Sequence, residues 1–392
     1  MVLSDIKVLD LTRVLAGPYA TMILADLGAE IIKVEQPGTG DDSRAYGPYK
    51  NGESAYFMSL NRNKQSMTLN LKTPEGKQIL KDLVKKVDVL VENFRPGAMQ
   101  RLGLGYDVLK EINPRLVYAT STGYGQTGPY SQRPAYDAVV QAMGGIMSIT
   151  GHPESGPTRV GSSMGDITAG LFCAIGILAA LHERESSGLG QMVDVAMLDC
   201  QVAILENAIS RYEITGEIPR PIGNRHPSIV PFEPFATLTD PIMVAAGNDK
   251  LWETLCALLE LDIVSDPRFV TNPKRNENYA ELRAILEDRF MTKTCAEWQK
   301  MFDAHGIPSG PINTVDKVVE NEQVVAREMI VEVDHPVAGL TRIPGIPIKL
   351  SRTPGEIRKS APVLGEDTEM LLGSYLGLTE EEVAELRDKK VI

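Results

Sequence analysis

Cysteine, histidine and long apolar runs are scarce in this sequence, and each scarcity excludes a class of protein. The four cysteines (Cys173, Cys200, Cys256 and Cys295) are widely scattered without CxxC spacing, so we expect reduced, mostly buried thiols and no disulfide scaffold. The five histidines form no HxxxH or HExxH pattern, so no metal site is expected. The N-terminus lacks the basic and apolar segments of a signal peptide, and the longest apolar run, 170–181, is too short to cross a bilayer. We therefore expect a cytoplasmic protein.

An excess of basic charge is also missing. The 392 residues carry 40 Lys plus Arg against 52 Asp plus Glu, which gives a formal net charge of -12. Because a basic face is the usual footprint of nucleic-acid binding, we expect no nucleic acid among the partners. The length allows two or three domains, and the 43% hydrophobic and 23% charged content is typical of a globular chain.

The N-terminal segment has the pattern of a βαβ unit but lacks the glycines of a dinucleotide-binding one. Strands are predicted at 6–12 and 30–35, and between them Pro18 suits the first turn of a helix that ends near Gly28. Glu35 stands where a dinucleotide-binding domain places its ribose-binding acid. The first turn, however, reads R-V-L-A-G-P and contains no G-x-G-x-x-G. The pattern therefore argues against an NAD-dependent dehydrogenase.

Strands and helices continue to alternate after this unit. Further strands are predicted at 64–72, 87–94, 117–125 and 191–197, and one intervening helix begins after Thr73 with Pro74 in its first turn. This alternation predicts an α/β fold with a mostly parallel sheet, whose ligands bind at the carboxyl ends of the strands. A Pro-rich stretch at 217–235 predicts an interdomain linker, after which a smaller unit follows.

Basic side chains gather around the predicted strand ends and can form an anion-binding set on an otherwise acidic protein. They are Arg62, Lys64, Lys72, Arg95 and Arg101. The alternative is a solvated charged face, and the charge pattern alone does not decide between the two.

The segment from Pro157 to Asp199 carries the main candidate for chemistry. A glycine-punctuated loop leads to Asp166 at the start of an apolar helix, and a strand follows. An Asp at a helix start is commonly a structural N-cap. The helix dipole also favours an ionised carboxylate there, which would make Asp166 a possible nucleophile at neutral pH. The residue pattern leaves both interpretations open.

Several segments, in this order, resemble one known family. They include VLDLTRVLAGPYATMILADLGAEIIKVEQPGTGD, VENFRPGAMQRLG, GDITAGLFCAIGILAAL and HGIPSGPI. Over nearly its whole length the chain resembles the class III coenzyme A-transferases, which include formyl-CoA:oxalate and carnitine CoA-transferases. The resemblance implies that Asp166 is the nucleophile, which forms a mixed anhydride with the acyl group and then an aspartyl-CoA thioester. Coenzyme A and acyl-CoA are then substrates, no permanently bound cofactor is expected, and the partners are an acyl-CoA donor and a small carboxylic acid acceptor.

The resemblance also implies a set of CoA-binding residues. The family's segment beside the adenosine matches Leu69–Lys72. Its Asn-Phe segment is followed by an arginine at a strand end and then by an arginine that contacts phosphate. A Tyr-acid pair of the family approaches the thioester. The expected contacts are Leu69, Lys72, Asn93, Phe94, Arg95, Arg101, Tyr136 and Asp137. Two positions depart from formyl-CoA transferase, because Leu15 stands at its Gln and Pro134 at its nearby Lys. The donor and acceptor acids are therefore not identified.

Two other functions stay open at this point. An acyl-CoA racemase of the same superfamily would need a His where Tyr136 stands, and tyrosine is a poor general base near pH 7. A non-catalytic CoA-binding protein is the alternative of another class, although the GDITAG context is retained.

The resemblance finally implies an architecture. A large Rossmann-like domain would be built from 1–205 and completed by a linker and return segment at 319–392. A linker at 206–235 would connect it to a small α/β domain at 236–318, and two chains would form a homodimer of interlocked rings.

Overall fold

The computed structural model describes all 392 residues, and the chain divides into two compact units. The first comprises Met1–Ile146, Arg159–Gly216 and Gln323–Ile392, and the second comprises Met147–Thr158 and Glu217–Glu322. The first unit is therefore assembled from three separate stretches of the chain. All four cysteines are free and buried, as the sequence predicts.

The first unit is built on a six-stranded parallel sheet, as expected for the α/β class. Its strands are β1 (Lys7–Asp10), β2 (Glu30–Glu35), β5 (Lys64–Thr68), β6 (Val89–Glu92), β7 (Val117–Thr122) and β8 (Met192–Ala196). The order β5-β2-β1-β6-β7-β8 is that of a doubly wound dinucleotide-binding sheet, with its switch point between β1 and β6. The strand predicted at 64–72 is shorter than expected, because pairing with β2 ends at Thr68.

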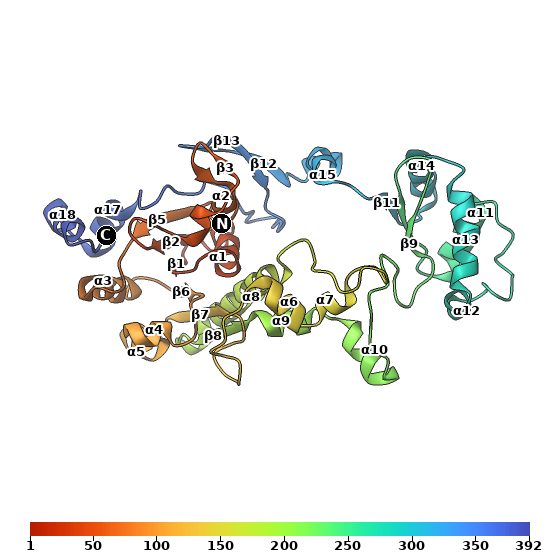
Figure 1. Cartoon of the computed structure of the whole chain (residues 1–392). Coiled ribbons are helices and arrows are strands. Elements are labelled where there is room, and N and C mark those ends of the chain that lie inside the picture. Colours follow the sequence, from red (N-terminus) through yellow and green to blue (C-terminus); the bar gives the residue numbers. More distant parts are fainter. The chain divides into compact units, whose positions relative to one another are not determined.

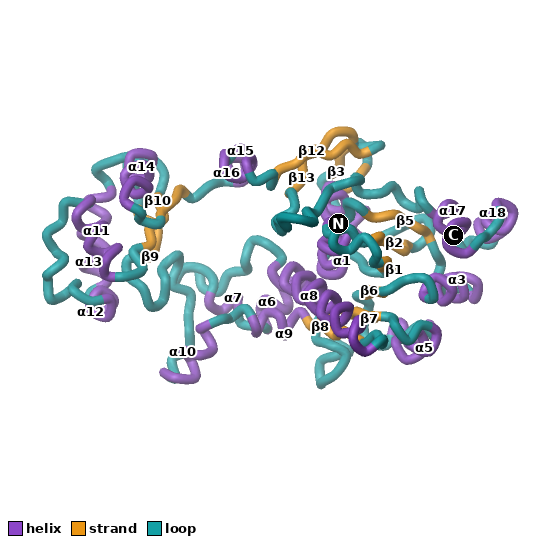
Figure 2. Tube along the Cα trace, turned by 180° about the vertical axis from the view of Figure 1, so that it is seen from behind, coloured by secondary structure: helices purple, strands orange, loops and turns teal.

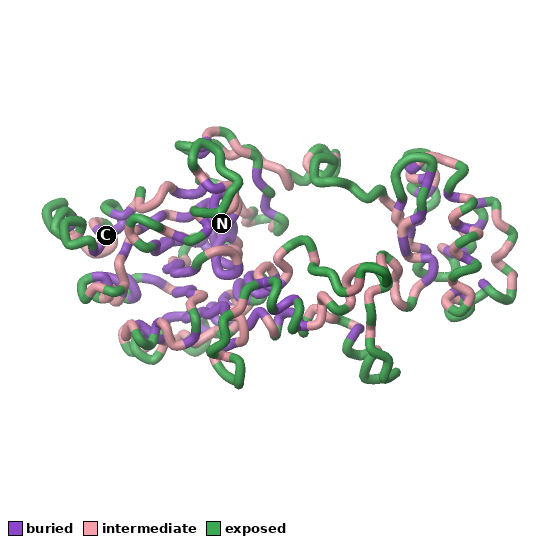
Figure 3. The backbone as a smooth tube through the Cα atoms, in the orientation of Figure 1, coloured by how far each residue is buried: buried purple, intermediate pink, exposed green.

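Helices cover both faces of this sheet (Figures 1 and 2). One face packs against α3 (Pro74–Val84), α4 (Ala98–Leu102), α5 (Tyr106–Ile112), α17 (Thr368–Leu371) and α18 (Glu380–Asp388). The other packs against α1 (Ala16–Asp26) and α8 (Met164–Ser187). The predicted cap of α3 is confirmed, because the Gly76 amide donates to Thr73 Oγ1 at 3.0 Å. The strands and the inner sides of these helices are buried (Figure 3).

α1 and α8 approach each other closely because a glycine lies between them. A Cβ at Gly170 would lie 2.7 Å from the carbonyl oxygen of Ala16 and 3.1 Å from the Tyr19 side chain, so no larger residue fits. By length and composition, α8 is apolar enough to cross a membrane, unlike the shorter run seen in the sequence. Half of that stretch is buried inside the protein, however, as is also common for the core helix of a soluble protein.

The C-terminal segment returns to the sheet beside β5. The Asn70 amide donates to the Val391 carbonyl at 2.7 Å, and the Thr68 amide donates to Thr368 Oγ1 at 3.0 Å.

The other elements of this unit are η1 (Asp42–Ala45), β3 (Tyr49–Lys50), β4 (Glu53–Ser54), α2 (Ala55–Leu60), α6 (Asp137–Met143), α9 (Met197–Ala203), α10 (Asn207–Thr215), β12 (Ile330–His335), β13 (Gly339–Pro344) and η2 (Leu372–Leu376). Short helices at the boundaries between the units are α7 (Ile146–Ile149) and α16 (Glu322–Ala326).

The second unit has an antiparallel sheet of three strands in the order β11-β10-β9. Its elements are β9 (Phe232–Phe235), β10 (Ile242–Ala245), α11 (Asp249–Leu258), α12 (Asn272–Glu277), α13 (Tyr279–Phe290), α14 (Cys295–His305), β11 (Ser309–Pro311) and α15 (Val315–Glu320). Trp252 and Trp298 are buried in its core.

Candidate active site

Two cavities lie at the carboxyl ends of the parallel strands. One of about 330 Å³ is lined by residues that follow β1, β2, β5 and β6, and one of about 230 Å³ by residues that follow β1, β6 and β7. Arg13, Asp42 and Phe94 line both, so the cavities adjoin. They lie at the switch point between β1 and β6, where sheets of this topology bind ligands.

The loops after β1 and β6 are tied together by one side chain. Asn93 Oδ1 accepts from the Arg13 amide and Asn93 Nδ2 donates to the Arg13 carbonyl, both at 2.8 Å. The Arg13 guanidinium lies 5.3 Å from the centre of the Phe94 ring and forms an ion pair of 3.2 Å with Asp42. The side-chain amide of Asn93, a residue expected to contact the ligand, thus fixes the loop after β1 that forms part of both cavities.

The larger of these two cavities has one apolar wall and charged side chains of both signs, among them Arg13, Glu35 and Asp42. Leu69, Leu71, Phe94 and Leu102 line it together with the exposed Lys72. Arg101 is exposed on α4 next to Leu102 and lines neither cavity. Leu69, Lys72 and Phe94, three of the expected contacts, thus lie in the wall of one cavity, and Arg101 lies outside it.

Two members of the predicted basic set are buried and do not face a ligand. Arg62 forms an ion pair with Asp26 at 2.6 Å, and Lys64 forms one with Asp10 at 3.0 Å. Lys64 also begins β5, so it lies at the end of the strand opposite to the cavities. The prediction that both belong to an anion-binding set is wrong, because each has a carboxylate partner far away in the sequence.

Asp166 lies in the wall of the smaller cavity, together with Tyr136, Arg95 and Arg133. It is the third residue of α8, whereas the N-cap position is Ser163, so the prediction of a structural N-cap is wrong. Its carboxylate is only partly exposed and has no hydrogen-bond or ion-pair partner within the chain. Asp42, the other acid of this wall, is paired with Arg13. Asp166 is therefore the unpaired carboxylate of the cavity.

A clamp of three polar side chains holds the loop that delivers Asp166. Asp137 accepts from the Gly165 amide at 2.8 Å, from Gln141 Nε2 at 2.9 Å and from Arg159 Nη2 at 2.9 Å. Gln141 Oε1 accepts from the Val160 amide at 3.0 Å. Asp137 does not line the cavity, so its buried carboxylate supports the loop and not a ligand wall.

Gly165 is required where α8 meets α6. A Cβ at this position would lie 2.6 Å from Cγ2 of Val140 and 3.1 Å from the Asp137 carboxylate. Because the amide of Gly165 must also reach Asp137, a side chain here would push the first turn of α8 away from α6. The glycine that precedes Asp166 in the GDITAG segment is therefore required by the packing of α8 against α6.

The surroundings of Asp166 make it unusually basic. Burial and the charge of Asp137 raise the pKa of Asp166 from 3.8 to about 7, against the opposing effect of Arg159. The sequence predicts that the helix start keeps this carboxylate ionised, and the structure corrects that prediction. Burial and the charge of Asp137 bring the pKa of Asp166 close to neutral pH, so both its protonated and its ionised form are present there.

Two helices begin at the smaller cavity. Leu15 and Ala16 of the α1 start line it together with Asp166 of the α8 start. Neither N-cap residue makes a side-chain cap, and the first N–H groups of a helix carry partial positive charge. The arrangement favours negative charge that develops inside this cavity. Val14, immediately before, has a left-handed φ of 67°, a strained backbone of a kind that often occurs at functional sites.

Several residues of this site were not selected from the sequence. They are Arg13, Ser121, Arg133, Gln141 and Arg159. Their only sequence clue is position, since Arg13 follows a predicted strand, Ser121 lies within one and Arg133 precedes Tyr136 by three residues. The tertiary fold is needed to bring Arg13, Ser121 and Arg133 to one cavity, and Gln141 and Arg159 to the loop before Asp166.

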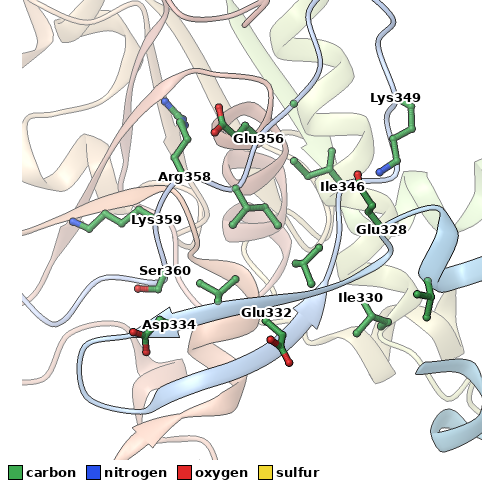
Figure 4. A pocket seen from close by; sticks show the side chains of 15 residues that line it. Glu328, Ile330, Glu332, Asp334, Ile346, Lys349, Glu356, Arg358, Lys359 and Ser360 are labelled. Carbon is green, nitrogen blue, oxygen red and sulfur yellow. The ribbon is translucent and has the colours of Figure 1, made fainter. Parts of the chain in front are cut away.

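A further cavity, of about 740 Å³, lies elsewhere in the first unit. It is bounded by β12 and residues 355–360, and side chains of both signs surround it, among them Glu332, Asp334, Lys349 and Arg358 (Figure 4). It shares no residue with the two cavities at the sheet, and nothing in its mixed charge indicates one ligand class.

Comparison with known proteins gives consistent matches over the whole chain. The family model described as CoA-transferase family III matches residues 3–368. The chain is 41% identical to the succinyl-CoA:glutarate CoA-transferase of Homo sapiens, over 100% of this chain and 90% of that protein. It is 45% identical to the acetyl-CoA:oxalate CoA-transferase of Acetobacter aceti, over 93% of each. A CAIB/BAIF family protein from Brucella suis has a similar crystal structure, with a TM-score of 0.83, 38% identity and coverage of 94% of this chain and 98% of that one.

Proposed function

Because the chain belongs to CoA-transferase family III and is a class III CoA-transferase, we propose that Asp166 carries the acyl group and CoA in turn as covalent intermediates. The expected resemblance is thereby confirmed at the level of the family and its reaction, the transfer of CoA between carboxylic acids. The covalent role of Asp166 is our proposal.

The proposed reaction proceeds in balanced exchanges. An Asp166 oxygen attacks the thioester carbonyl carbon, the C–S bond breaks, and CoA leaves as a thiolate from a mixed anhydride. The thiolate then attacks the aspartyl carbonyl, which releases the donor carboxylate and leaves Asp166 as a CoA thioester. The acceptor carboxylate attacks this thioester, and the same steps run in reverse. Covalent catalysis of this kind divides one difficult transfer into easier steps.

One observation carries the proposal: Asp166 is a partly buried carboxylate without a protein partner, in the wall of a cavity at the switch point. A nucleophile must be free to approach a carbonyl, and a salt bridge would block it. The raised pKa of about 7 also makes the ionised form a stronger base than an ordinary carboxylate. At neutral pH a substantial ionised fraction remains available for attack.

The adjoining cavity suits the CoA body. Its apolar wall of Leu69, Leu71, Phe94 and Leu102 fits the adenine base, and Lys72 supplies positive charge at its rim. We propose that Arg101, exposed beside this wall, and Arg95, in the wall shared with Asp166, bind phosphate or carboxylate groups of the bound acyl-CoA.

We further propose that the acceptor acids are small dicarboxylates. The two relatives described above are named for glutarate and oxalate, both dicarboxylic acids. A second carboxylate needs a cation near the reacting one. Arg133 lines the Asp166 cavity, and its guanidinium lies 3.8 Å from the centre of the Tyr130 ring, which orders it without neutralising it.

A homodimer, in which the two chains are interlocked, is our proposal for the assembly. The outer side of α8 exposes Leu171, Phe172 and Ile175, the last by 59%. Such an apolar face on a core helix favours coverage by a second copy. Light scattering tests it: wild type should have twice the chain mass, and Ile175→Asp should shift the protein toward monomer. A monomeric wild type at micromolar concentration would contradict the assembly.

The covalent step has a direct test. The protein is mixed with succinyl-CoA, treated with hydroxylamine, and digested for mass spectrometry. A hydroxamate on Asp166 is expected in wild type, and none at that peptide in Asp166→Asn, which should also fail to move CoA to glutarate or oxalate. A wild type that transfers CoA without any modification of Asp166 would overturn the covalent proposal but not the family assignment. A matrix of acyl-CoA donors and mono- and dicarboxylic acceptors then tests the substrate class.

A further inference from the structure

A hydroxyl group in the wall of the Asp166 cavity has no partner in the protein. Ser121, the penultimate residue of β7, is 3% exposed, and its Oγ makes no hydrogen bond within the chain. The two neighbouring hydroxyls are both engaged. Thr120 Oγ1 donates to Asp194 at 3.2 Å, and Thr122 Oγ1 accepts from the Gly125 amide at 3.0 Å.

An unpartnered hydroxyl at this depth calls for an explanation. Buried polar groups in folded proteins nearly always have a hydrogen-bond partner, because leaving one unpaired costs about 1–3 kcal/mol. Ser121 lines the cavity that also contains Asp166. Its missing partner is therefore a group that enters this cavity.

The direction of the side chain follows from the strand. Successive residues of a strand face opposite sides, and Val117 and Ala119 pack in the core formed with α1 and α8. Ser121, at the carboxyl end of β7, therefore lies on the same face of the sheet as Val117 and Ala119, whereas Tyr118 packs on the opposite face. The hydroxyl thus lies on the side of the sheet covered by α8, whose first turn carries Asp166.

We propose that the Ser121 hydroxyl donates a hydrogen bond to the carbonyl oxygen of the acyl group while Asp166 attacks its carbon. The proposal rests on the covalent function of Asp166 given above. As the new C–O bond forms, the carbonyl electron pair moves to oxygen, and Ser121 stabilises this oxyanion without transferring its proton. When the C–S bond breaks and CoA thiolate leaves, the C=O bond is restored.

Asp166 and Ser121 line the same cavity, so both can act on one acyl carbonyl. A volume of about 230 Å³ corresponds to roughly eight water molecules at ~30 Å³ each, so an acyl carbonyl held there for attack lies close to every wall. The other neutral hydroxyls of the wall are less suited. Thr122 follows Tyr118 and Thr120 on the opposite face of β7, and the side chains of Tyr46 and Tyr136 are exposed, by 40% and 75%.

The test measures how fast Asp166 is modified after rapid mixing with succinyl-CoA in the absence of an acceptor. Ser121→Ala should slow this step by about 100- to 1,000-fold, the range seen when one oxyanion-hole donor is removed. Its melting temperature should not fall, since the hydroxyl has no protein partner to lose. Ser121→Cys keeps the volume but offers only a weak donor, so it should be slowed in the same direction.

Thr120→Val is the matched control. It removes a buried hydroxyl from the same strand, on the opposite face and outside the cavity wall, so it should lower stability and leave the rate of Asp166 modification unchanged. Modification of Ser121→Ala and Ser121→Cys at the wild-type rate would overturn the role of Ser121 while leaving Asp166 in place. If wild type itself formed no adduct, the covalent function would fail and the Ser121 proposal with it.

Discussion

Replacing Asp166 by Asn should make the protein more stable, and increasingly so as the pH rises. The pKa of Asp166 is raised from 3.8 to about 7 by burial and by Asp137, against Arg159. Between these pH values the folded chain holds a proton that the unfolded chain has released, so the free energy of unfolding of wild type falls as pH rises. Asn cannot ionise, and the variant escapes this loss.

The magnitude follows from the two pKa values. A difference of about 3 pH units, at roughly 1.4 kcal/mol each, gives about 4 kcal/mol, fully developed above pH 7 and absent below about pH 4. At roughly 2 cal/mol/K of unfolding entropy per residue, this corresponds to about 7 °C in Tm if the larger unit melts cooperatively. Calorimetry of wild type and Asp166→Asn at pH 4.5, 6 and 8 measures the difference, which should grow with each step.

Asp199→Asn provides the matched control. Asp199 is the third residue of α9, as Asp166 is of α8, but it is exposed to solvent. Without the burial that disfavours the carboxylate, its substitution should produce no stabilisation that grows with pH. A Tm difference between wild type and Asp166→Asn that is the same at pH 4.5 and pH 8 would refute the electrostatic description of the site.

Three further variants probe the rest of this framework. Arg159→Gln removes the cation that lowers the pKa of Asp166, so the pH at which modification by succinyl-CoA reaches half its maximal rate should move upward; an unchanged profile would contradict the clamp. Lys64→Met leaves the charge of Asp10 buried without its ion pair and should cost about 3–5 kcal/mol, seen as a large loss of Tm or of soluble protein. Lys72→Met should leave Tm within 1–2 °C, roughly, because Lys72 is exposed, but should raise the Kd for CoA several-fold in calorimetric titrations at low salt; a Kd equal to that of wild type would remove Lys72 from the binding surface.

Much of the sheet could be predicted because its causes are local. The strands at 30–35 and 117–122 appear as runs of β-branched and apolar residues, and Thr73 caps its helix through an amide three residues away. The absence of a G-x-G-x-x-G motif also argued correctly against a dinucleotide-binding enzyme. Glu35 at the expected ribose position is used by Arg44 at 2.7 Å and by Ser66 Oγ at 2.7 Å, so it is not free for a dinucleotide.

The errors concern residues whose partners are distant in sequence. Lys64 reads as a strand-end cation, yet its carboxylate partner Asp10 is 54 residues away. Asp137, whose expected role as a ligand contact stays a prediction, also has a distant partner, because its carboxylate accepts from the Gly165 amide, 28 residues away. Neither pattern nor composition contains such pairings.

By itself, then, the sequence determined the alternation of strands and helices, the family and the presence of Asp166 in the first turn of an apolar helix. These features depend on interactions between residues a few positions apart, or on short motifs that occur in a fixed order along the chain. The tertiary structure alone decided which acid stays unpaired, that its pKa rises, and that the Ser121 hydroxyl has no partner within the chain. Burial and charge pairing are sums over neighbours from many segments, and only folding brings those neighbours together.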